Sequence, residues 1–400
     1  MEENGNHNNG ANHIAREAAL AHFSLMFGYK IFSLYYPLFL AATGLSLLQI
    51  GEVYFWIYFP MAVAAPLAGF LSRAIHPALM AAAGCLGYAA YALGMVFWGG
   101  VAIAYLWQIV LGISAAFFFT ASRALLIADS DGDSEHDFSW FYNASFWSAA
   151  LAPAVGALIV WKFGFEAAFM TSAFICVYAA LISAGMITNP WHTKRGHLTW
   201  LHFKNGWEKA FKLAFTKIAA GYIALSFVVL LAANALHPFF VLFLRDDIGL
   251  DQTQILRFVA IMAAAFSIFY FFILRRWQNG RPESGILRGA AVAGASTAMF
   301  GIFLPVLNYV GAFFIEFSRG VGGFLVNTGR SALLAKELKS RPAEGAALDT
   351  VFSPLGIALA AIFGGLVIDR LGYQWLLLIT GAMIFIAYFI VLIAKRREMG

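Results

Sequence analysis

Long apolar runs follow one another along this chain of 400 residues, and they constrain its fold more than any other feature. A helix needs about 20 apolar residues to cross the hydrocarbon core of a bilayer. The runs lie at 21–43, 50–71, 77–98, 101–127, 139–161, 165–187, 217–244, 252–274, 285–304, 306–334, 346–368 and 373–394. The break between the ninth and tenth runs depends on Pro305 and Asn308. The sequence therefore predicts an all-α membrane protein with about twelve transmembrane helices.

Composition supports a chain whose surface faces lipid. The residues are 61% hydrophobic and 12% charged, whereas soluble domains are about half apolar and about a quarter charged. One core cannot hide so much apolar side chain, because the surface of a folded chain grows too fast with its size. The net charge of +5 does not indicate nucleic acid, since its basic residues gather in loops.

The distribution of basic residues predicts the orientation of the chain, because cytoplasmic loops are enriched in Lys and Arg. One set of alternating loops holds Arg73, six basic residues from Lys194 to Lys217, Arg275, Arg276, Arg281, Lys336, Lys339, Arg341 and Lys395–Arg397. The other set holds Lys162, Arg245, Arg257 and Arg370. We expect a multi-pass protein of the cell inner (plasma) membrane with both termini in the cytoplasm.

The spans fall into two groups of six, separated by a polar stretch. We predict a cytoplasmic tail at 1–20, an N-terminal six-helix bundle at 21–187, a cytoplasmic amphipathic linker at 188–216, a C-terminal six-helix bundle at 217–395 and a tail at 396–400. In the linker, Trp200, Phe203 and Trp207 recur at helical spacing while lysines fall elsewhere on the wheel. That pattern is typical of a helix lying in the membrane interface.

An internal repeat relates the two bundles. Arg123-Ala-Leu-Leu resembles Arg330-Ser-Ala-Leu-Leu, 207 residues later. The segments starting at Gly156 and Gly364 align at an offset of 208, and those starting at Gly44 and Gly249 align at 205. A near-constant offset indicates two parallel, pseudo-symmetric repeats, an arrangement associated with alternating access to a site at mid-membrane.

Several motifs resemble those of the major facilitator superfamily over nearly the whole chain. Gly44–Gly51 is similar to the entry of the family's second helix, and Gly69–Arg73 resembles the loop that follows, with Ser72 in place of an Asp. Gly112-Ile-Ser-Ala-Ala resembles the glycine turn of the fourth helix, with Gln108 in place of the family's upstream Arg. Pro153-x-x-Gly156 is similar to part of the fifth-helix antiporter motif, without its preceding Gly. The resemblance implies two rocking six-helix bundles, a small-molecule solute and a functional monomer.

Lys30 lies near the middle of the first span, beside Tyr29. A charge at that depth costs at least a few kcal/mol and needs a partner, water or a purpose. We predict a substrate-binding or coupling role for both residues, with the lysine as a counter-charge for an anion or as a titrating group. The alternative is a lysine that reaches the interface or pairs with a neighbouring helix.

Glu316 and Arg319 lie midway along the tenth span, three residues apart on one helix face. Glu316 is a candidate proton-coupling carboxylate, and Arg319 is a candidate clamp for a carboxylate or phosphate. Gln108 occupies the matching place in the first half. The alternative is an internal ion pair that holds two helices together.

Polar residues in two further spans complete the predicted substrate site. Asn234 and His237-Pro238 interrupt the seventh span, where a proline lets a helix bend and a histidine is able to titrate near neutral pH. Asn143 and Trp147 are deep enough in the fifth span to face a cavity. The alternatives are a histidine that satisfies a buried hydrogen bond and a tryptophan of the interfacial belt.

Arg73, Arg123 and Arg330 are predicted gating residues at the cytoplasmic ends of spans. In the family that the chain resembles, such residues tie loops across the halves when the inner gate shuts. The alternative is ordinary positive charge on cytoplasmic loops.

These features predict a secondary active transporter of a small organic solute, with protons as a candidate coupling ion. One alternative is a multidrug efflux pump for lipophilic compounds, and another is a receptor or scaffold that moves nothing. The sequence has no G-x-x-x-x-G-K-[ST], H-E-x-x-H or G-x-S-x-G motif, and the acidic loop 129–137 lacks the spacing of an EF-hand. We therefore expect no enzyme activity, cofactor or metal, and partners limited to the solute, the bilayer and protons.

Overall fold

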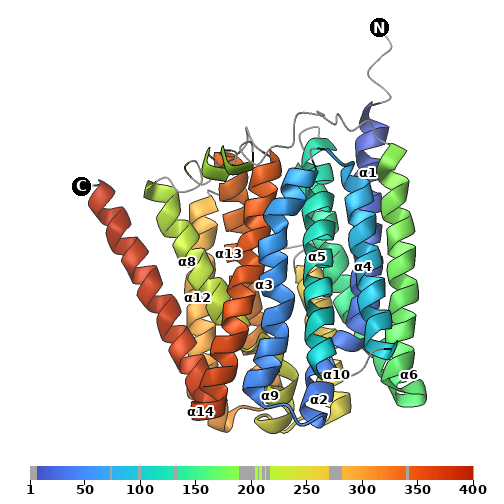
Figure 1. Cartoon of the computed structure of the whole chain (residues 1–400). Coiled ribbons are helices and arrows are strands. Elements are labelled where there is room, and N and C mark those ends of the chain that lie inside the picture. Colours follow the sequence, from blue (N-terminus) through green and yellow to red (C-terminus); the bar gives the residue numbers. More distant parts are fainter. Residues whose placement is uncertain are drawn as a thin grey trace.

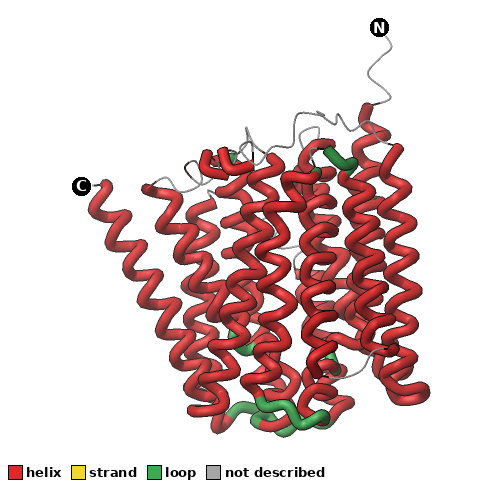
Figure 2. Tube along the Cα trace, viewed as in Figure 1, coloured by secondary structure: helices red, strands yellow, loops and turns green. Residues whose placement is uncertain are grey.

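Helices make up the regular structure of the described part of the chain (Figure 2). The computed structural model describes residues 7–72, 74–97, 101–129, 134–188, 203–205, 207–209, 212, 217–269, 282–338 and 342–399. α1 begins and α14 ends at the same end of an elongated bundle (Figure 1). We call this end the terminal end and the other the opposite end.

The first half contains α1 (His7–Ser33), α2 (Tyr36–Ala42), α3 (Leu47–Leu71), α4 (Pro77–Phe97), α5 (Val101–Asp129), α6 (Ser134–Gly185) and the 3₁₀ turn η1 (Met186–Thr188). The second half contains α8 (Lys217–Asn234), the 3₁₀ turn η2 (His237–Phe239), α9 (Phe240–Asp246), α10 (Gln252–Phe269), α12 (Pro282–Phe303), the 3₁₀ turn η4 (Leu304–Val306), α13 (Tyr309–Glu337) and α14 (Pro342–Met399). α1 begins earlier than the apolar run at 21, because Ile14, Ala15 and Ala18 continue its buried face.

Twelve spans cross the described part of the bundle. Ten helical stretches there are long and apolar enough to cross a membrane. Two of them, of 46 and 49 residues, each hold two spans because the chain turns back at Gly164 and Gly372. The expected break near Pro305 is confirmed, since α13 starts after Asn308, whose Oδ1 accepts a hydrogen bond from the Gly311 amide at 2.9 Å. The predicted all-α membrane fold is therefore confirmed.

The repeat seen in the sequence reappears in the backbone. Gly164 and Gly372 have φ of 81° and 82°, in the left-handed region that favours glycine. They lie 208 residues apart, the offset between Gly156 and Gly364. A β-carbon at Gly156 would overlap the Ile31 carbonyl oxygen on α1, and one at Gly364 would overlap a carbonyl oxygen of the seventh span. Each half thus seats its fifth helix on its first by the same close approach.

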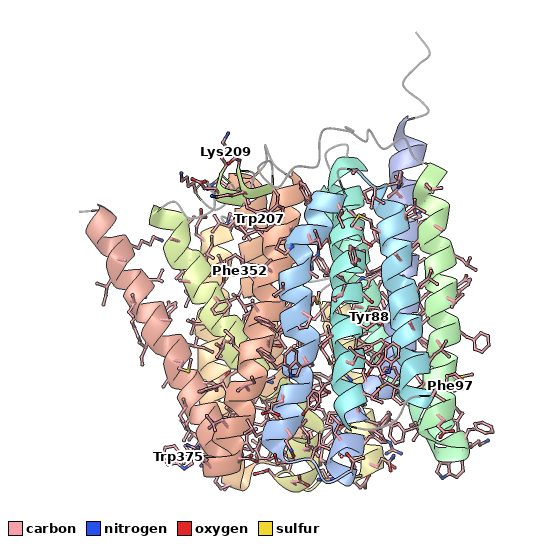
Figure 3. All side chains as sticks on the ribbon, viewed as in Figure 1. Tyr88, Phe97, Trp207, Lys209, Phe352 and Trp375 are labelled. Carbon is pink, nitrogen blue, oxygen red and sulfur yellow. The ribbon has the colours of Figure 1, made fainter. Side chains whose placement is uncertain are left out.

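The two halves meet along two helix pairs. α3 packs along the first part of α14, and α6 packs along α10. The first span bends between α1 and α2, and the seventh bends at η2, where Pro238 follows the predicted His237. Apolar side chains such as Phe97 and Trp375 project outward toward the opposite end, while Trp207 and Lys209 lie at the terminal end (Figure 3). This surface is that of a bundle solvated by lipid.

Most of the predicted linker lies outside the described residues. Within it, the Phe203 ring is 5.3 Å from Phe70 of the first half and 6.3 Å from Trp207. Trp207 packs against the core of the second half. The described part of the linker therefore contacts both halves.

Candidate functional site

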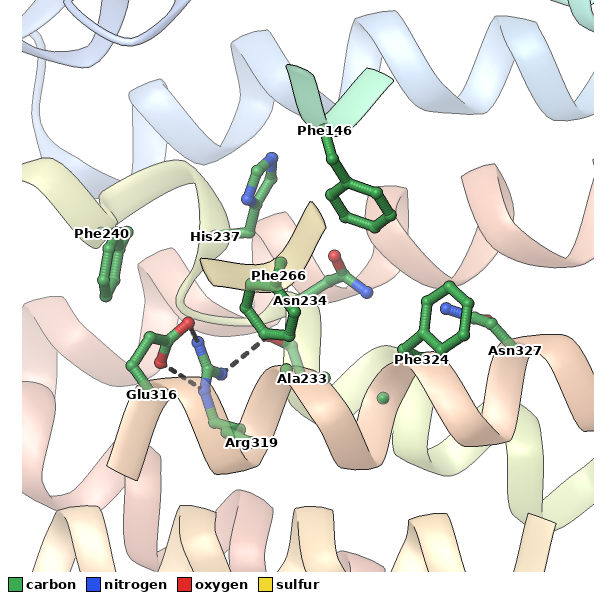
Figure 4. Close-up of a pocket in the computed structure, with 12 residues that line it drawn as sticks. Phe146, Ala233, Asn234, His237, Phe240, Phe266, Glu316, Arg319, Phe324 and Asn327 are labelled. Carbon is green, nitrogen blue, oxygen red and sulfur yellow. Dashed lines mark hydrogen bonds and ion pairs between the residues drawn. The ribbon is translucent and has the colours of Figure 1, made fainter. Parts of the chain in front are cut away.

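A cavity of about 310 Å³ lies where α6 of the first half faces α8, η2, α10 and α13 of the second (Figure 4). Pockets for small ligands start at about this size. It is lined by Phe146, Ala233, Asn234, His237, Phe240, Phe266, Glu316, Arg319, Gly320, Gly323, Phe324 and Asn327. Asn234, His237, Glu316 and Arg319 are the four predicted site residues that the cavity brings together.

An ion pair forms one wall of the cavity. Arg319 Nε donates to Glu316 Oε2 at 2.7 Å, and Nη2 donates to Oε1 at 2.8 Å. Arg319 Nη1 donates to the Ala233 carbonyl at 2.9 Å, which ties α13 to α8. The arginine side chain is 6% exposed and the carboxylate 16%. Spacing of three residues on α13 allows this two-pronged contact, in which all three guanidinium nitrogens have acceptors.

Amide and imidazole groups add polar contacts along the cavity. Asn234 donates from Nδ2 to the Leu230 carbonyl at 2.7 Å, which leaves its Oδ1 available. His237 lies in η2, at the bend of the seventh span, and its side chain lines the cavity. Asn327 Oδ1 is buried without a hydrogen-bond partner. Because this acceptor lies at the cavity wall, a donor on a ligand or a water molecule can satisfy it.

Aromatic rings close the cavity between the halves. Phe146 of α6 stacks on Phe266 of α10 at 6.1 Å and lies 6.3 Å from Phe324 of α13. A β-carbon at Gly320 would overlap the Phe266 ring, so the glycine seats that ring against α13. A β-carbon at Gly323 would meet no atom within 4 Å, so this glycine borders open space in the cavity.

Lys30 and Tyr29 do not line this cavity. Lys30 Nζ donates to the Ser145 carbonyl at 2.7 Å and to Ser145 Oγ at 3.0 Å, which joins α1 to α6 inside the first half. The Tyr29 ring packs edge-on against Phe32 and Tyr88. These contacts match the alternative of a lysine that pairs with a neighbouring helix.

The other first-half candidates also lie outside the cavity. Gln108 is fully buried and donates from Nε2 to the Tyr36 hydroxyl at 2.8 Å. Asn143 is 4% exposed, and its Oδ1 has no partner. Trp147 is 42% exposed and does not line the cavity, whereas its neighbour Phe146 does. The helix turns about 100° per residue, so adjacent residues on α6 face different surroundings.

At the terminal end, two repeat-related arginines share one carboxylate. Arg330 Nε donates to Asp349 Oδ1 at 3.1 Å. Arg123 of the first half lies 3.5 Å from Asp349 Oδ2 and donates to Thr350 Oγ1 at 2.9 Å. Ser331 donates to the same carboxylate at 2.9 Å. Asp349 therefore links the halves at this end. Arg73, the third predicted gating residue, lies outside the described residues.

At the opposite end, the halves are joined mainly by backbone packing. A β-carbon at Gly51 of α3 would overlap the Ala361 carbonyl oxygen of α14, and one at Gly365 would lie 2.9 Å from the Leu47 carbonyl oxygen. The amide of Leu48 donates to Asp369 Oδ2 at 3.3 Å. Contacts between the halves thus lie on both sides of the level of the cavity.

The sequence analysis missed several residues of these sites. Phe146, Phe324 and Asn327 line the cavity, and Asp349 holds the two arginines, yet none was singled out. The repeat relates Arg123 to Arg330 but does not point to Asp349, because the matching position in the first half is Tyr142. The described residues contain no group of three or more His, Cys, Asp or Glu that could hold a metal ion.

Comparison with known proteins identifies the family of the chain and a solved structure with the same fold. A sequence profile of the Major Facilitator Superfamily matches residues 18–348. The crystal structure of the human organic anion transporter MFSD10 (TETRAN) is similar, with a TM-score of 0.72. That similarity covers 94% of this chain and 99% of that chain at 14% sequence identity, so it shows a shared fold. No curated protein sequence matches the chain.

Proposed function

Because the chain belongs to the major facilitator superfamily of transporters, we propose that it carries a small organic solute across the membrane by alternating access. In this mechanism two bundles rock about a site near mid-membrane. The family match supports the transporter class, and the solute and its coupling are the further steps of the proposal.

The cavity between α6 and the second half is the observation that carries the proposal. Its volume suits a small organic molecule, and its walls combine phenylalanine rings with an ion pair and two amides. A mostly apolar pocket with a few convergent polar groups is the usual form of a small-molecule site. Because both halves contribute to its wall, relative rotation of the halves would change access to it.

Two sets of contacts between the halves are candidate gates. At the terminal end, Arg123 of the first half meets Asp349 and Thr350 of the second. At the opposite end, Gly51 packs on the Ala361 carbonyl. Opening one side requires breaking one set while the other holds. Arg330 supports the first gate, because it orients the same Asp349 carboxylate.

Glu316 is the candidate coupling carboxylate. It faces the cavity and is held by Arg319, so a change in its protonation changes the charge of the binding site. A proton gradient would then drive the solute. We place the protein in the plasma membrane with cytoplasmic termini, because the basic loops gather at one side of the predicted topology. We further propose a functional monomer, as membership of the family implies.

The proposal is tested in proteoliposomes that contain the purified protein. A thermal-shift screen of small organic acids, amines and neutral aromatic compounds provides the solute, and counterflow measures its transport. Gly323→Leu should abolish counterflow, because the new side chain fills open space in the cavity. Gly221→Leu is the matched control, since that glycine of α8 has no neighbour closer than 4.0 Å and does not line the cavity.

Normal counterflow in Gly323→Leu would discard the cavity as the solute site. A pH gradient that drives uptake in the wild type but not in Glu316→Gln would support proton coupling, with Glu208→Gln on the exposed linker as the control. Uptake that ignores the gradient in the wild type would remove the coupling step from the proposal.

The phenylalanine rings favour a second candidate, export of lipophilic compounds. A lipophilic exporter would accept permanently charged aromatic cations and neutral dyes of varied shape. Counterflow restricted to one charge class of solute would favour the first candidate over this one.

A further inference from the structure

The guanidinium of Arg319 is already occupied by a carboxylate in the wall of the cavity. Two of its nitrogens bind the two oxygens of Glu316 at 2.7 and 2.8 Å, and the third binds the Ala233 carbonyl. The bidentate geometry is the one by which arginine recognises carboxylate ligands. Glu316 therefore stands where the carboxylate of a solute would bind.

The charge balance of the cavity determines when a solute carboxylate can replace Glu316 on Arg319. The ion pair is neutral, so the empty cavity holds no net charge from these two residues. A proton on Glu316 leaves the Arg319 cation without its partner, and an uncompensated charge away from water is costly. The carboxylate of a solute restores neutrality. The empty and the loaded cavity are then both neutral, whereas the protonated cavity without solute is not.

The rest of the cavity describes the body of the solute. Phe146, Phe266 and Phe324 surround the space with rings, and aromatic pairs favour stacked or edge-on contacts with a further ring. Open space lies beside Gly323 on the same helix face as the ion pair. The unpartnered Asn327 Oδ1 fits a hydroxyl or N–H on the solute.

We propose that the solute is an aromatic monocarboxylate that displaces Glu316 from Arg319 and is carried together with one proton on Glu316. The bonds balance: two charge-assisted hydrogen bonds to Glu316 are exchanged for two to the solute, and the proton enters with the anion. The inference rests on the proposed transport function and assigns its substrate class. Transport is electroneutral, so it follows a pH gradient and does not respond to membrane potential.

Other charged groups around Glu316 are few. Among the residues that line the cavity, the titratable ones are Glu316, Arg319 and His237. α6 and α10 contribute only phenylalanines to the wall, and α8 contributes Ala233 and Asn234. His237 is thus the other lining group whose protonation would change the charge of the cavity, and it requires its own control variant. Lys30 of α1 lies outside the wall but within electrostatic reach of His237.

The test measures binding and proton uptake together in detergent, where passive permeation of the probe plays no part. The probes are phenylacetate and 1-naphthylacetate, with phenylacetamide and phenethylamine as neutral and cationic counterparts. In weakly buffered solution, a pH indicator should record one proton taken up for each carboxylate bound. Because proton and anion bind together, the apparent affinity should rise by up to about tenfold per unit fall in pH.

The variants separate the two residues. Glu316→Gln should bind the carboxylates without proton uptake and with no pH dependence, because its arginine is no longer occupied by a charge. Arg319→Gln should weaken carboxylate binding by about tenfold or more, the usual effect of losing a charge-assisted pair. His237→Gln should keep the proton stoichiometry of the wild type.

Three results would overturn the inference: binding of the carboxylates without proton uptake, preference for the amide or the amine, or no binding of either carboxylate. A failure of the proposed transport function would give a different result. A carboxylate that binds with one proton but shows no counterflow would contradict transport while leaving the site assignment standing. Counterflow of phenethylamine would support the transport function and contradict the inference that the solute is an anion.

Discussion

The two halves of the molecule share a backbone plan but differ in their polar interiors. Gly156 and Gly364 seat the fifth and eleventh spans by the same close approach to a carbonyl oxygen, and Gly164 and Gly372 turn the chain in the same way. The matching positions 108 and 316 differ in character. Gln108 is locked in the core of the first half, whereas Glu316 faces the cavity.

The difference shows what each half contributes. In the first half, central polar side chains bond to neighbours on adjacent helices, as Lys30 does to Ser145 and the Gln108 Nε2 group does to Tyr36. In the second half, the ion pair and the amides border open space. The first half therefore acts as a wall that supplies Phe146, and the second half supplies the binding chemistry. Four predictions probe this contrast.

The largest effect is expected from Arg319→Gln. It leaves the Glu316 carboxylate mostly buried without its partner, which costs about 3–5 kcal/mol of unfolding free energy. The double variant Glu316→Gln/Arg319→Gln removes both charges and should recover most of that loss. Denaturant titration in detergent micelles measures both. Equal stability of the single and double variants would mean that the unpaired Glu316 carboxylate does not destabilise the fold, and that the ion pair has no interaction energy of its own.

Gly156→Ala and Gly364→Ala should destabilise the two halves alike. Each added methyl group would overlap a backbone carbonyl oxygen, and overpacking of this kind costs about 1–3 kcal/mol. Gly221→Ala on α8 is the control, because its new methyl group meets nothing closer than 4.0 Å. Thermal unfolding followed by tryptophan fluorescence compares the three variants. A loss of stability in only one of the two variants would contradict the inference that both halves use the same close approach.

Gln108→Leu should cost about 1 kcal/mol, because it removes a buried hydrogen bond to Tyr36 together with the amide that makes it. Transport should keep the wild-type rate, since the side chain does not line the cavity. Counterflow and denaturant titration on the same preparation check both points. A lower transport rate at unchanged stability would support the predicted role of Gln108 in substrate binding.

Glu208→Gln should have no measurable effect on stability or transport. The hydrogen bond from Lys212 lowers the pKa of Glu208, but both side chains are exposed on the linker. Because the folded-state pKa is depressed, any stabilisation is present at neutral pH and fades as the pH falls through that pKa. A clear loss of transport in this variant would show that the linker takes part in the cycle.

Much of the site could be predicted because polar residues are conspicuous in apolar spans. Glu316, Arg319, Asn234 and His237 stand out for this reason, and the cavity brings all four together. Lys30 satisfied the same criterion but bonds within its own half. Depth in a span predicts that a charge needs a partner, and it does not say whether that partner is a ligand or a neighbouring helix.

The site residues that the sequence analysis missed do not stand out from their neighbours in the sequence. Phe146 is one of 40 phenylalanines, and no pattern in the chain distinguishes a ring that faces a cavity from one that faces lipid. Asp349 lies near the terminal end, where polar residues are expected, and Asn327 carries no charge that would mark it within α13. Their roles depend on which helix faces them, and that is a property of the packed bundle.

By itself the sequence determined the number of spans, the duplication and the polar residues that need partners, because lipid admits only apolar helices of a fixed length and penalises every unpaired charge. Only the tertiary structure decided which of those residues meet one another. The rotation and crossing of each helix turn Arg319 onto Glu316 and Lys30 onto Ser145, and both follow from close packing with helices far away in the chain.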